Sequence, residues 1–516
     1  CAVFRPEWLD GLLNQAQRPE VGIVGSKLVS ADEKITHAGL VLGLNGIAGR
    51  AFQGEPMEAS GYMSRLWVAQ NYSAVAGDGL MVRRSLYLEL GGLDEGAFAE
   101  QGAEVDLCLR VTEANYLVVW TPHAMLLDNR LPEPEPVALQ DAFYARWLPR
   151  LARDPAYNPN FSLGRSPAGF ALTDSQLTWK PLVWQPVPVV MAHYADTFGC
   201  GHYRVIQPFH AQRDAGLIQG VITHNLMPVL DLERYSPDVI LLQRQIGEER
   251  LEAMRRMKAF STAFRVYELD DYLPSLPLKN MHRETMPRDI VKSLRRGLGY
   301  VDRFVVSTEA LAEAFGGFHQ RIQVMQNRLY PQWWGADVLP ASQRRRGEKP
   351  RVGWAGGSSH TGDLELIADV VAALAGEVEW VFMGLCPDKL RPFVHEFHQG
   401  VEISQYPAAL ARLDLDLALA PLENNLFNEC KSNLRLLEYG ACGFPVICSD
   451  LRCYAGDLPV TRVKNRYASW VEAIRMHLAD LDETARRGDW LRDQVRQHWM
   501  LEGDNLQAWY RAWQPD

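Results

Sequence analysis

Residues 428–450 read N-E-C-K-S-N-L-R-L-L-E-Y-G-A-C-G-F-P-V-I-C-S-D. This order predicts a helix that ends at a glycine, followed by a strand that opens with a proline. Lys431, Arg435 and Glu438 are three or four residues apart, so they share one helix face. Two cations and a carboxylate on one face suit a diphosphate and a ribose diol. The alternative is a solvated face that carries a salt bridge.

A glycine-rich segment lies ahead of that helix, where residues 351–363 read R-V-G-W-A-G-G-S-S-H-T-G-D. The pattern predicts a strand, a loop and the start of a helix. Gly356 and Gly357 would let the backbone approach a phosphate closely, and free N–H groups at a helix N-terminus attract anions. Ser358 and His360 add donors. A tight turn with a capping residue remains the alternative, because a glycine-rich loop alone does not distinguish a phosphate site from a structural turn.

Together the two segments resemble the C-terminal motifs of family 4-type (GT-B) glycosyltransferases, with an N-x-x-K-S-x-x-K/R-x-L-E-Y-x-A-x-G-x-P-V core. The resemblance implies a nucleotide-diphosphate-sugar site that includes Asn428, Lys431, Ser432, Arg435 and Glu438. Glu438 takes the ribose-binding role. Many members carry a second acid eight positions before this one, where the present chain has Cys430. The sugar-facing role therefore does not transfer to the adjacent Glu429.

Two further segments match the same family. Residues 198–208 read F-G-C-G-H-Y-R-V-I-Q-P, and the resemblance implies that Gly201 and Arg204 face the nucleotide, with Arg204 near the phosphates. A surface helix cap is the alternative. Residues 267–273 read Y-E-L-D-D-Y-L, so two acids follow a predicted strand. Asp271 could act as a catalytic base, or these acids could cap the next turn.

Residues 1–165 resemble the C-terminal half of a family 2 (GT-A) glycosyltransferase domain. The match is carried by G-G-L-D-E, E-V-D-L-C-L-R and D-P-A-Y-N-P-N, at residues 91–95, 104–110 and 154–160. The resemblance implies a site with Glu104 as the catalytic base, Asp106 beside it and Asp78 as an acceptor contact.

The metal-binding elements of the GT-A family are incomplete in this block. The D-x-D motif would lie before Cys1, and Asp128 and Asn129 replace a late pair of histidines. We therefore expect residues upstream of Cys1. A divalent cation is expected only if the block is active and complete upstream; otherwise it is a structural remnant.

Strand-like and helical segments alternate from residue 187 onward, which favours parallel α/β sheets. The predicted fold class is α/β: a GT-B unit of two Rossmann-like halves facing a cleft, preceded by a partial GT-A-like domain. The predicted boundaries are a partial GT-A-like domain at 1–165, a linker at 166–187, a first half at 188–335, a linker at 336–349, and a nucleotide-sugar-binding half at 350–516 whose last helix crosses back to the first half.

Composition limits the classes of function. The 516 residues are 47% hydrophobic and 22% charged, with a net charge of −10, which argues against non-specific nucleic-acid binding. No apolar run is long enough to span a bilayer, and there is no signal peptide, so only peripheral membrane contact is expected. The eight cysteines include no C-x-x-C pair. These features predict a cytoplasmic protein with no metal site in the GT-B region.

The sequence thus predicts a hexosyltransferase that moves a sugar from a nucleotide-diphosphate donor to a glycan, lipid-linked or protein acceptor. Surface polysaccharide synthesis and protein glycosylation are the expected settings, and the GT-B unit needs no cofactor. Two alternatives stay open. One is a non-catalytic glycosyltransferase-like scaffold. The other is a hydrolysing sugar-nucleotide epimerase, which shares the fold but should place acids around the sugar in both halves; Cys430 weakens that reading.

Overall fold

The computed structural model describes residues 1–130, 133–173, 186–276, 289–340 and 349–516. The chain divides into two compact units. The first comprises Cys1–Trp184, Met227–Ser236 and Ala259–Ser261; the second comprises Gln185–Leu226, Pro237–Lys258 and Thr262–Asp516. The two short inserted segments of the first unit were assigned by the sequence to the first Rossmann-like half. Of the two predicted linkers, residues 174–185 and 341–348 lie outside the described residues.

The first unit contains a mixed sheet with the order β1-β8-β2-β3, where β6 also pairs with β8 and β7 with β2. The long strands β2 (Val21–Val29) and β8 (Leu117–Leu127) run parallel, and the other pairs are antiparallel. The remaining strands are β1 (Ala2–Val3), β3 (Ile35–His37), β6 (Gln70–Tyr72) and β7 (Met81–Val82), with a separate hairpin of β4 (Leu40–Leu42) and β5 (Ala48–Arg50).

Helices of the first unit bury their apolar sides in one core with this sheet. Residues of α3 (Ala103–Glu113), α4 (Val137–Ala152) and α7 (Val229–Tyr235) share that core, which explains why α7 belongs to the first unit. The other helices are α1 (Trp8–Ala16), η1 (Tyr62–Trp67) and α2 (Arg84–Glu89).

The first half of the second unit is built on a six-stranded parallel sheet with the order β10-β9-β11-β12-β13-β14. Its strands are β9 (Val189–His193), β10 (Gln219–Thr223), β11 (Val239–Gln243), β12 (Phe264–Leu269), β13 (Arg303–Val306) and β14 (Ile322–Val324). Its helices are α5 (Gly199–Gly201), η3 (His202–Ile206), α6 (Gln207–Asp214), α8 (Glu248–Phe260), η4 (Leu273–Ser275), α9 (Ile290–Leu298), α10 (Glu309–Ala314) and α11 (Pro331–Trp334).

The second half has its own six-stranded parallel sheet, in the order β17-β16-β15-β18-β19-β20. Its strands are β15 (Arg351–Ala355), β16 (Glu379–Met383), β17 (Glu396–His398), β18 (Leu417–Ala420), β19 (Val446–Ser449) and β20 (Thr461–Val463). Its helices are η6 (Ser358–His360), α12 (Thr361–Glu365), α13 (Ala368–Leu374), η7 (Arg391–Phe393), α14 (Tyr406–Arg412), α15 (Leu426–Glu429), α16 (Leu434–Ala441), η8 (Arg452–Tyr454), α17 (Tyr467–Ala479), α18 (Leu481–His498) and α19 (Gly503–Trp513).

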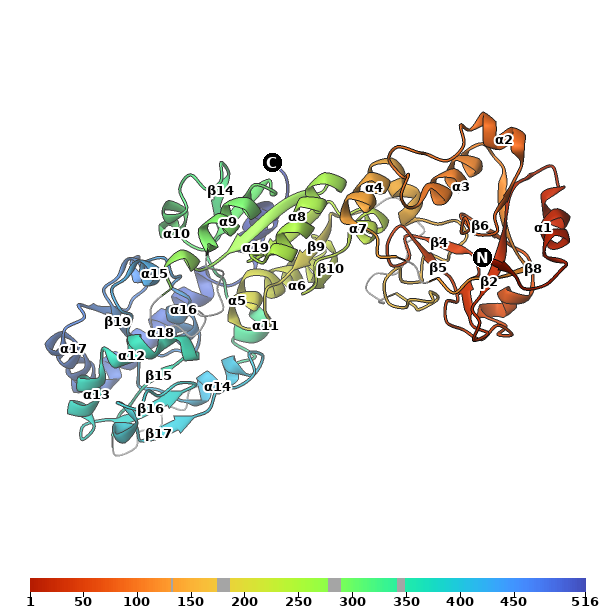
Figure 1. The fold of residues 1–516 in the computed structure, drawn as a ribbon. Helices are drawn as coiled ribbons and strands as arrows, with labels where there is room; N and C mark the ends of the chain where they lie inside the picture. Colours follow the sequence, from red (N-terminus) through yellow and green to blue (C-terminus); the bar gives the residue numbers. More distant parts are fainter. Residues whose placement is uncertain (131–132, 174–185, 277–288, 341–348) are drawn as a thin grey trace. The chain divides into compact units, whose positions relative to one another are not determined.

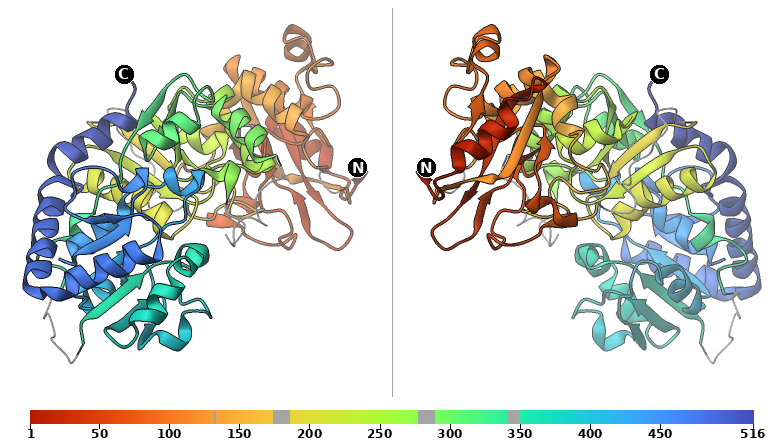
Figure 2. Two further views of the ribbon diagram at one scale, coloured as in Figure 1. Left: turned by 90° about the vertical axis from the view of Figure 1, so that its left-hand side faces the viewer. Right: turned by 90° about the vertical axis from the view of Figure 1, so that its right-hand side faces the viewer.

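Two parallel sheets, each surrounded by crossover helices, make two Rossmann-like halves within one unit (Figures 1 and 2). This is the GT-B fold, so the predicted fold class of the second unit is confirmed. In each sheet the first strand of the half is internal, and the winding reverses beside it, between β9 and β11 and between β15 and β18. Ligands of open parallel sheets bind at such points, at the carboxyl ends of the strands.

The last helix of the chain completes the core of the first half. Trp509 and Trp513 of α19 are fully buried and pack in one cluster with Val190 of β9 and Phe209 of α6. The C-terminus accordingly ends beside the first half in the ribbon views (Figures 1 and 2). The final segment therefore links the second half of the unit to the core of the first half.

Arg204 ties the same parts together through polar contacts. Its side chain is 0% exposed and forms an ion pair with Glu268 of β12, with an N–O distance of 3.0 Å. It also donates to the Met325 carbonyl at 2.5 Å and to Asn327 at 2.8 Å, and its guanidinium lies 4.7 Å from the ring centroid of Trp509. The prediction that Arg204 faces the phosphates is wrong, because its donors are used inside the core.

Replacing Arg204 with Met should leave the Glu268 carboxylate buried without its counter-charge. We expect the free energy of unfolding of the second unit to fall by about 3–5 kcal/mol. Urea unfolding followed by tryptophan fluorescence measures this loss. The matched control is Arg213→Met, which removes an exposed ion pair with Asp214 and should cost less than about 1 kcal/mol. Equal losses in the two variants would contradict the role of Arg204.

Candidate functional site

The glycine loop lies at the carboxyl end of β15, at the switch point of the second sheet. A Cβ atom at Gly356 would collide with the guanidinium of Arg435, which lies 5.0 Å from the ring centroid of Trp354 and donates to the Ala355 carbonyl. The same Cβ would lie 2.7 Å from the Trp354 ring, so a side chain at position 356 would require both the arginine and the ring to move. A Cβ atom at Gly357 would meet nothing within 4 Å, so the backbone there is open to a ligand. The Ser358 side chain lies outside the described residues.

His360 is fixed in one neutral form. Its Nδ1 lies 2.7 Å from Asp363 Oδ2, and its Nε2 lies 3.3 Å from a guanidinium nitrogen of Arg435. Because arginine only donates, Nε2 accepts and Nδ1 donates to Asp363. Burial, together with the nearby charge of Lys431, lowers the pKa of His360 to about 3. The predicted donation from His360 to a phosphate is not available, since both ring nitrogens are engaged.

Asn428 holds this loop against the neighbouring strand connection. Its side-chain amide donates to Asp363 Oδ1 at 3.0 Å and to the Glu423 carbonyl at 2.9 Å. The Asn428 residue is 2% exposed. Asn428 was predicted to bind the nucleotide sugar, but here it positions Asp363 and through it His360.

Lys431 lies in a break between α15 and α16, so the predicted helix is interrupted at the lysine. It precedes the N-terminus of α16 and is only partly buried. Its ammonium lies 5.0 Å from the ring centroid of Phe427. Its charge lowers the pKa of His360 in the second half and opposes the rise in the pKa of Asp271 in the first half. Lys431 therefore lies close to titratable groups of both halves, His360 in the second and Asp271 in the first.

Glu438 joins the two halves. Its Oε1 accepts a hydrogen bond from the Tyr203 hydroxyl of the first half at 2.8 Å, and its Oε2 accepts one from the Tyr406 hydroxyl at 3.2 Å. Glu438 is 6% exposed, and burial raises the pKa of its carboxyl. Each carboxylate oxygen accepts only one of these hydrogen bonds and keeps a second acceptor site, to which a ribose diol could donate.

Ser432 makes a second polar contact between the halves. Its hydroxyl accepts from the side-chain amide of Asn327 at 2.9 Å, and Asn327 is itself a partner of Arg204. The seryl side chain is partly buried and borders the cleft.

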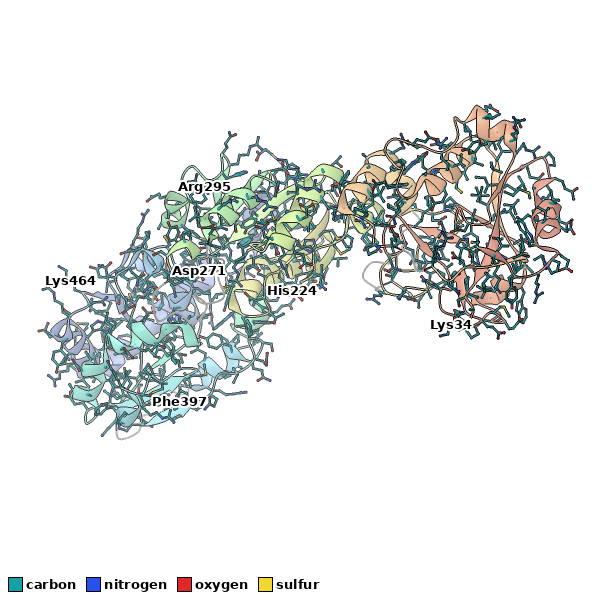
Figure 3. The ribbon with its side chains drawn as sticks, viewed as in Figure 1. Lys34, His224, Asp271, Arg295, Phe397 and Lys464 are labelled. Atoms are coloured by element: carbon teal, nitrogen blue, oxygen red, sulfur yellow. The ribbon has the colours of Figure 1, made fainter. Side chains whose placement is uncertain are left out.

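Asp270 and Asp271 follow β12 and face residues 198–201, the first glycine loop, and Asp271 is marked in Figure 3. Their carboxylates and the Cys200 thiol lie within 4.8 Å of one another. Sequence analysis predicted no metal site in this unit; in the folded chain Cys200 lies beside these two acids. Burial, then the charge of Asp270, raises the pKa of Asp271 to about 6. A carboxylate in that range can accept a proton near neutral pH.

Gly201 has a packing role. A Cβ atom there would collide with the backbone carbonyl of Asp196, whose carboxylate accepts from the Gly201 N–H at 3.1 Å. The close approach inside the turn accounts for this glycine without a phosphate.

In the first unit, Asp106 lies apart from the other two predicted site residues, Glu104 and Asp78. Asp106 is fully buried and accepts from Arg110 at 2.8 Å and from Arg146 and Trp147 at 2.9 Å, so its predicted site role is wrong. Glu104 and Asp78 do come near each other: burial, and to a smaller extent the charge of Asp78, raises the pKa of Glu104.

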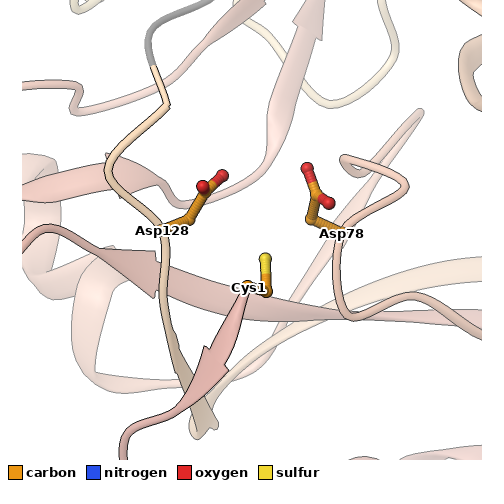
Figure 4. A group of neighbouring side chains, drawn as sticks. All are labelled: Cys1, Asp78 and Asp128. Atoms are coloured by element: carbon orange, nitrogen blue, oxygen red, sulfur yellow. The ribbon is translucent and has the colours of Figure 1, made fainter.

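Asp78 is also part of a small carboxylate cluster in the first unit. Arg130 forms ion pairs with both Asp78 and Asp128. The Cys1 thiol lies within 4.8 Å of both carboxylates, and the three side chains converge in Figure 4. A guanidinium therefore already stands between the two acids that a cation would use.

Sequence reasoning missed Trp354, Tyr406 and Cys200 as parts of the site. Trp354 comes from β15, Cys200 from α5 and Tyr406 from the start of α14, and no spacing of residue types marks them as site residues. The cysteine had one usable signal, since it stands between two glycines in the first loop.

Comparisons with known proteins give partial matches. None of the protein-family models matches the chain. The uncharacterized protein y4gI of Sinorhizobium fredii is 40% identical over 174 residues, which are 32% of this chain and 19% of that protein. The O-antigen biosynthesis protein RfbC of Myxococcus xanthus is 35% identical over 177 residues, which are 32% of this chain and 14% of that protein. The chain thus spans less than a fifth of these relatives.

Among solved structures, the chain is similar to sucrose-phosphate synthase from Thermosynechococcus elongatus, with a TM-score of 0.44 and 13% identity over 62% of this chain and 97% of that one. It is also similar to Anabaena HepE in complex with UDP-glucose, with a TM-score of 0.45 and 12% identity over 63% and 98% of the two chains. Within the described residues, no helix combines the length and the apolar character needed to cross a bilayer.

The depressed pKa of His360 predicts a pH dependence of stability. Below pH 6.5 the unfolded chain protonates this histidine, while the folded chain keeps it neutral down to about pH 3. Folding therefore loses stability as the pH falls through that window, by about 2 kcal/mol between pH 7 and pH 5. His360→Asn should lack this component in urea unfolding at the two pH values. The exposed control His498→Asn should follow the wild type; a parallel loss in all three proteins would contradict the assignment.

Proposed function

We propose that the second unit transfers a sugar from a nucleotide-diphosphate donor to a hydroxyl group of an acceptor. The observation that carries the proposal is the placement of Lys431. Its charge acts on His360 beside the glycine loop and on Asp271 of the opposite half. A cation placed between the two halves suits a leaving diphosphate at the glycine loop of the second half. It also suits an acceptor hydroxyl beside Asp271 of the first half.

The diphosphate would lie over Gly357 and ahead of α16. The backbone at Gly357 is open, and the unpaired N–H groups at the start of a helix attract negative charge. Lys431 adds a full positive charge three residues before that helix. His360 keeps Arg435 in place without adding charge of its own. Such fixed charges stabilise a leaving group most when they need no reorganisation during the reaction.

Asp271 is the proposed base. The acceptor oxygen forms a bond to the anomeric carbon, the bond from that carbon to the diphosphate breaks, and the diphosphate departs with the electron pair. The proton of the acceptor hydroxyl passes to Asp271. A pKa of about 6 leaves this carboxylate mostly ionised at neutral pH while keeping it basic enough to take the proton.

The acceptor and the setting are proposed from chain similarity. About a third of the chain resembles a protein named for O-antigen biosynthesis, which supports surface polysaccharide synthesis and a glycan or lipid-linked acceptor. The sequence motifs also suggested a protein as a possible acceptor and a hexose as the transferred sugar, and we keep both in the proposal. We also propose that the reaction takes place in the cytoplasm, as expected from the sequence.

A non-catalytic scaffold is the second candidate, and one observation favours it. Both carboxylate oxygens of Glu438 are taken by tyrosine hydroxyls, and Arg204 is enclosed in the core. Two of the residues that the motif assigns to the donor are thus engaged with the protein itself. A scaffold would bind no nucleotide sugar, which separates it from the transferase. A hydrolysing epimerase would release free nucleotide from its donor without any acceptor.

Lys431→Ala tests the transferase. If Lys431 stabilises the leaving diphosphate, kcat should fall at least about tenfold beyond any loss of donor binding. Release of nucleotide from UDP-glucose and related donors, followed at saturating donor, measures kcat, and calorimetry with UDP measures binding. Lys464→Ala is the control, because that lysine is exposed in the same half (Figure 3). An unchanged kcat in Lys431→Ala would rule out the proposed role.

Transfer by the second unit should not require a metal ion. We expect the rate in excess EDTA to stay within about twofold of the untreated rate, since fixed cations replace the metal at the leaving group. Loss of activity that Mn²⁺ restores would show the opposite. In that case Asp270→Asn and Asp78→Asn would tell whether the ion binds at the Cys200 group of the second unit or at the Cys1 group of the first.

A further inference from the structure

One cleft of the second unit lies away from the glycine loop. It has a volume of about 570 Å³ and lies between the ends of β13 and β14 on one side and the 429–433 segment on the other. The described residues of the glycine loop do not line it. Lys431, Ser432 and Asn433 stand in its wall, so the cleft borders the proposed diphosphate position ahead of α16.

Three contacts between the halves fix the shape of this cleft. The Thr308 hydroxyl donates to the Cys430 carbonyl at 2.8 Å, and the Asn327 amide donates to the Ser432 hydroxyl at 2.9 Å. Arg452 forms a two-pronged ion pair with Glu313, with both distances at 2.6 Å. The cavity is thus preformed, as ligand sites usually are.

The lining is rich in neutral hydrogen-bonding groups. It includes the amides of Asn433 and Gln494 and the hydroxyls of Ser307 and Ser432. Asn433 occupies the N-cap position of α16, yet its side chain makes no capping bond, so the amide is left for another partner. A side-chain amide offers two donors and an acceptor, which suits adjacent hydroxyl groups on a ring. The Trp499 ring also lines the cleft, and one cation already stacks on it: the guanidinium of Arg328, 4.5 Å from its centroid.

The charge of the lining argues against an anionic ligand. Among the described lining residues, the carboxylates of Glu309, Glu429 and Asp457 outnumber the cations Lys431 and Arg452. Arg452 is in addition neutralised by Glu313. The net negative charge of this lining would repel a diphosphate, but it would not repel a neutral polyol.

We propose that this cleft binds a pyranose unit of the acceptor. Paired amides, hydroxyls and an indole in a preformed cavity match a neutral ring that carries several hydroxyl groups. The assignment rests on the proposed transferase function, because the wall at Lys431 brings a bound sugar next to the groups that would act on it. The same chemistry could come from the transferred sugar of the donor, and the experiment separates the two sources.

Gln494→Ala and Ala455→Phe test the site in the full-length chain. The first removes an amide on α18, and the second adds bulk at an exposed position of the cleft wall. Their matched controls are Gln497→Ala, which changes an exposed amide on the same helix, and Ala455→Ser, which adds little volume.

The probes are the methyl glycosides of glucose, galactose, mannose and rhamnose, followed by saturation-transfer NMR. At least one should give ring-proton signals with the wild type and both controls. We expect these signals to weaken about fivefold or more in Gln494→Ala and Ala455→Phe, the effect of one lost hydrogen bond or a blocked cavity. UDP affinity by calorimetry should be equal in all five proteins.

Other results overturn the inference. Signals that persist in both cleft variants, or no signal with any glycoside on the wild type, would exclude the site. If Gln494→Ala weakens UDP-glucose but not UDP, the cleft holds the donor sugar and the acceptor assignment is wrong. Failure of the wild type to bind UDP or UDP-glucose would instead count against the proposed transferase, whatever the glycosides show.

Discussion

A buried guanidinium connects three distant parts of the second unit. Arg204 follows the first glycine loop, pairs with Glu268 at the core of the first sheet, and stacks on Trp509 of the final helix. Through Asn327 its contacts reach Ser432 beside the cleft. A charge with no access to water is tolerated only when its donors are all used. The positions of the first loop, the last helix and the cleft wall are therefore set by the same side chain.

A comparable arrangement of neutral and charged groups shapes the glycine loop. Asn428 holds Asp363, Asp363 fixes the tautomer of His360, and His360 accepts from Arg435. The chain of contacts ends at Gly356, where a side chain would require Arg435 and Trp354 to move. Residues that read as ligand contacts in the motif thus form the support, and Gly357 and Lys431 are left for the ligand. The two halves then contribute different groups: fixed positive charge from the second, a basic carboxylate from the first.

The sequence predicted the repeated strand–helix pattern of the second unit well, because parallel sheets bury both faces and leave continuous apolar strands. It also identified the segments after β15 and β12 and around α16 that carry the candidate site. It misjudged Arg204 and Asp106 for one shared reason. A polar residue inside a motif looks the same whether it faces a ligand or a buried partner, and its partners here lie in strands and helices far away in the chain.

What the sequence by itself determined is local: the glycine loops, the helix that follows Lys431, and the strand that precedes Asp270 and Asp271 follow from neighbouring residues, whereas the break at Lys431 did not. Burial and pairing were decided only in three dimensions. Tyr203 and Glu438 are 235 positions apart yet share a hydrogen bond, and Cys200 joins two acids 70 residues away. Desolvation and charge proximity, which raise the pKa of Asp271 and lower that of His360, depend on atoms that only the folded chain brings together.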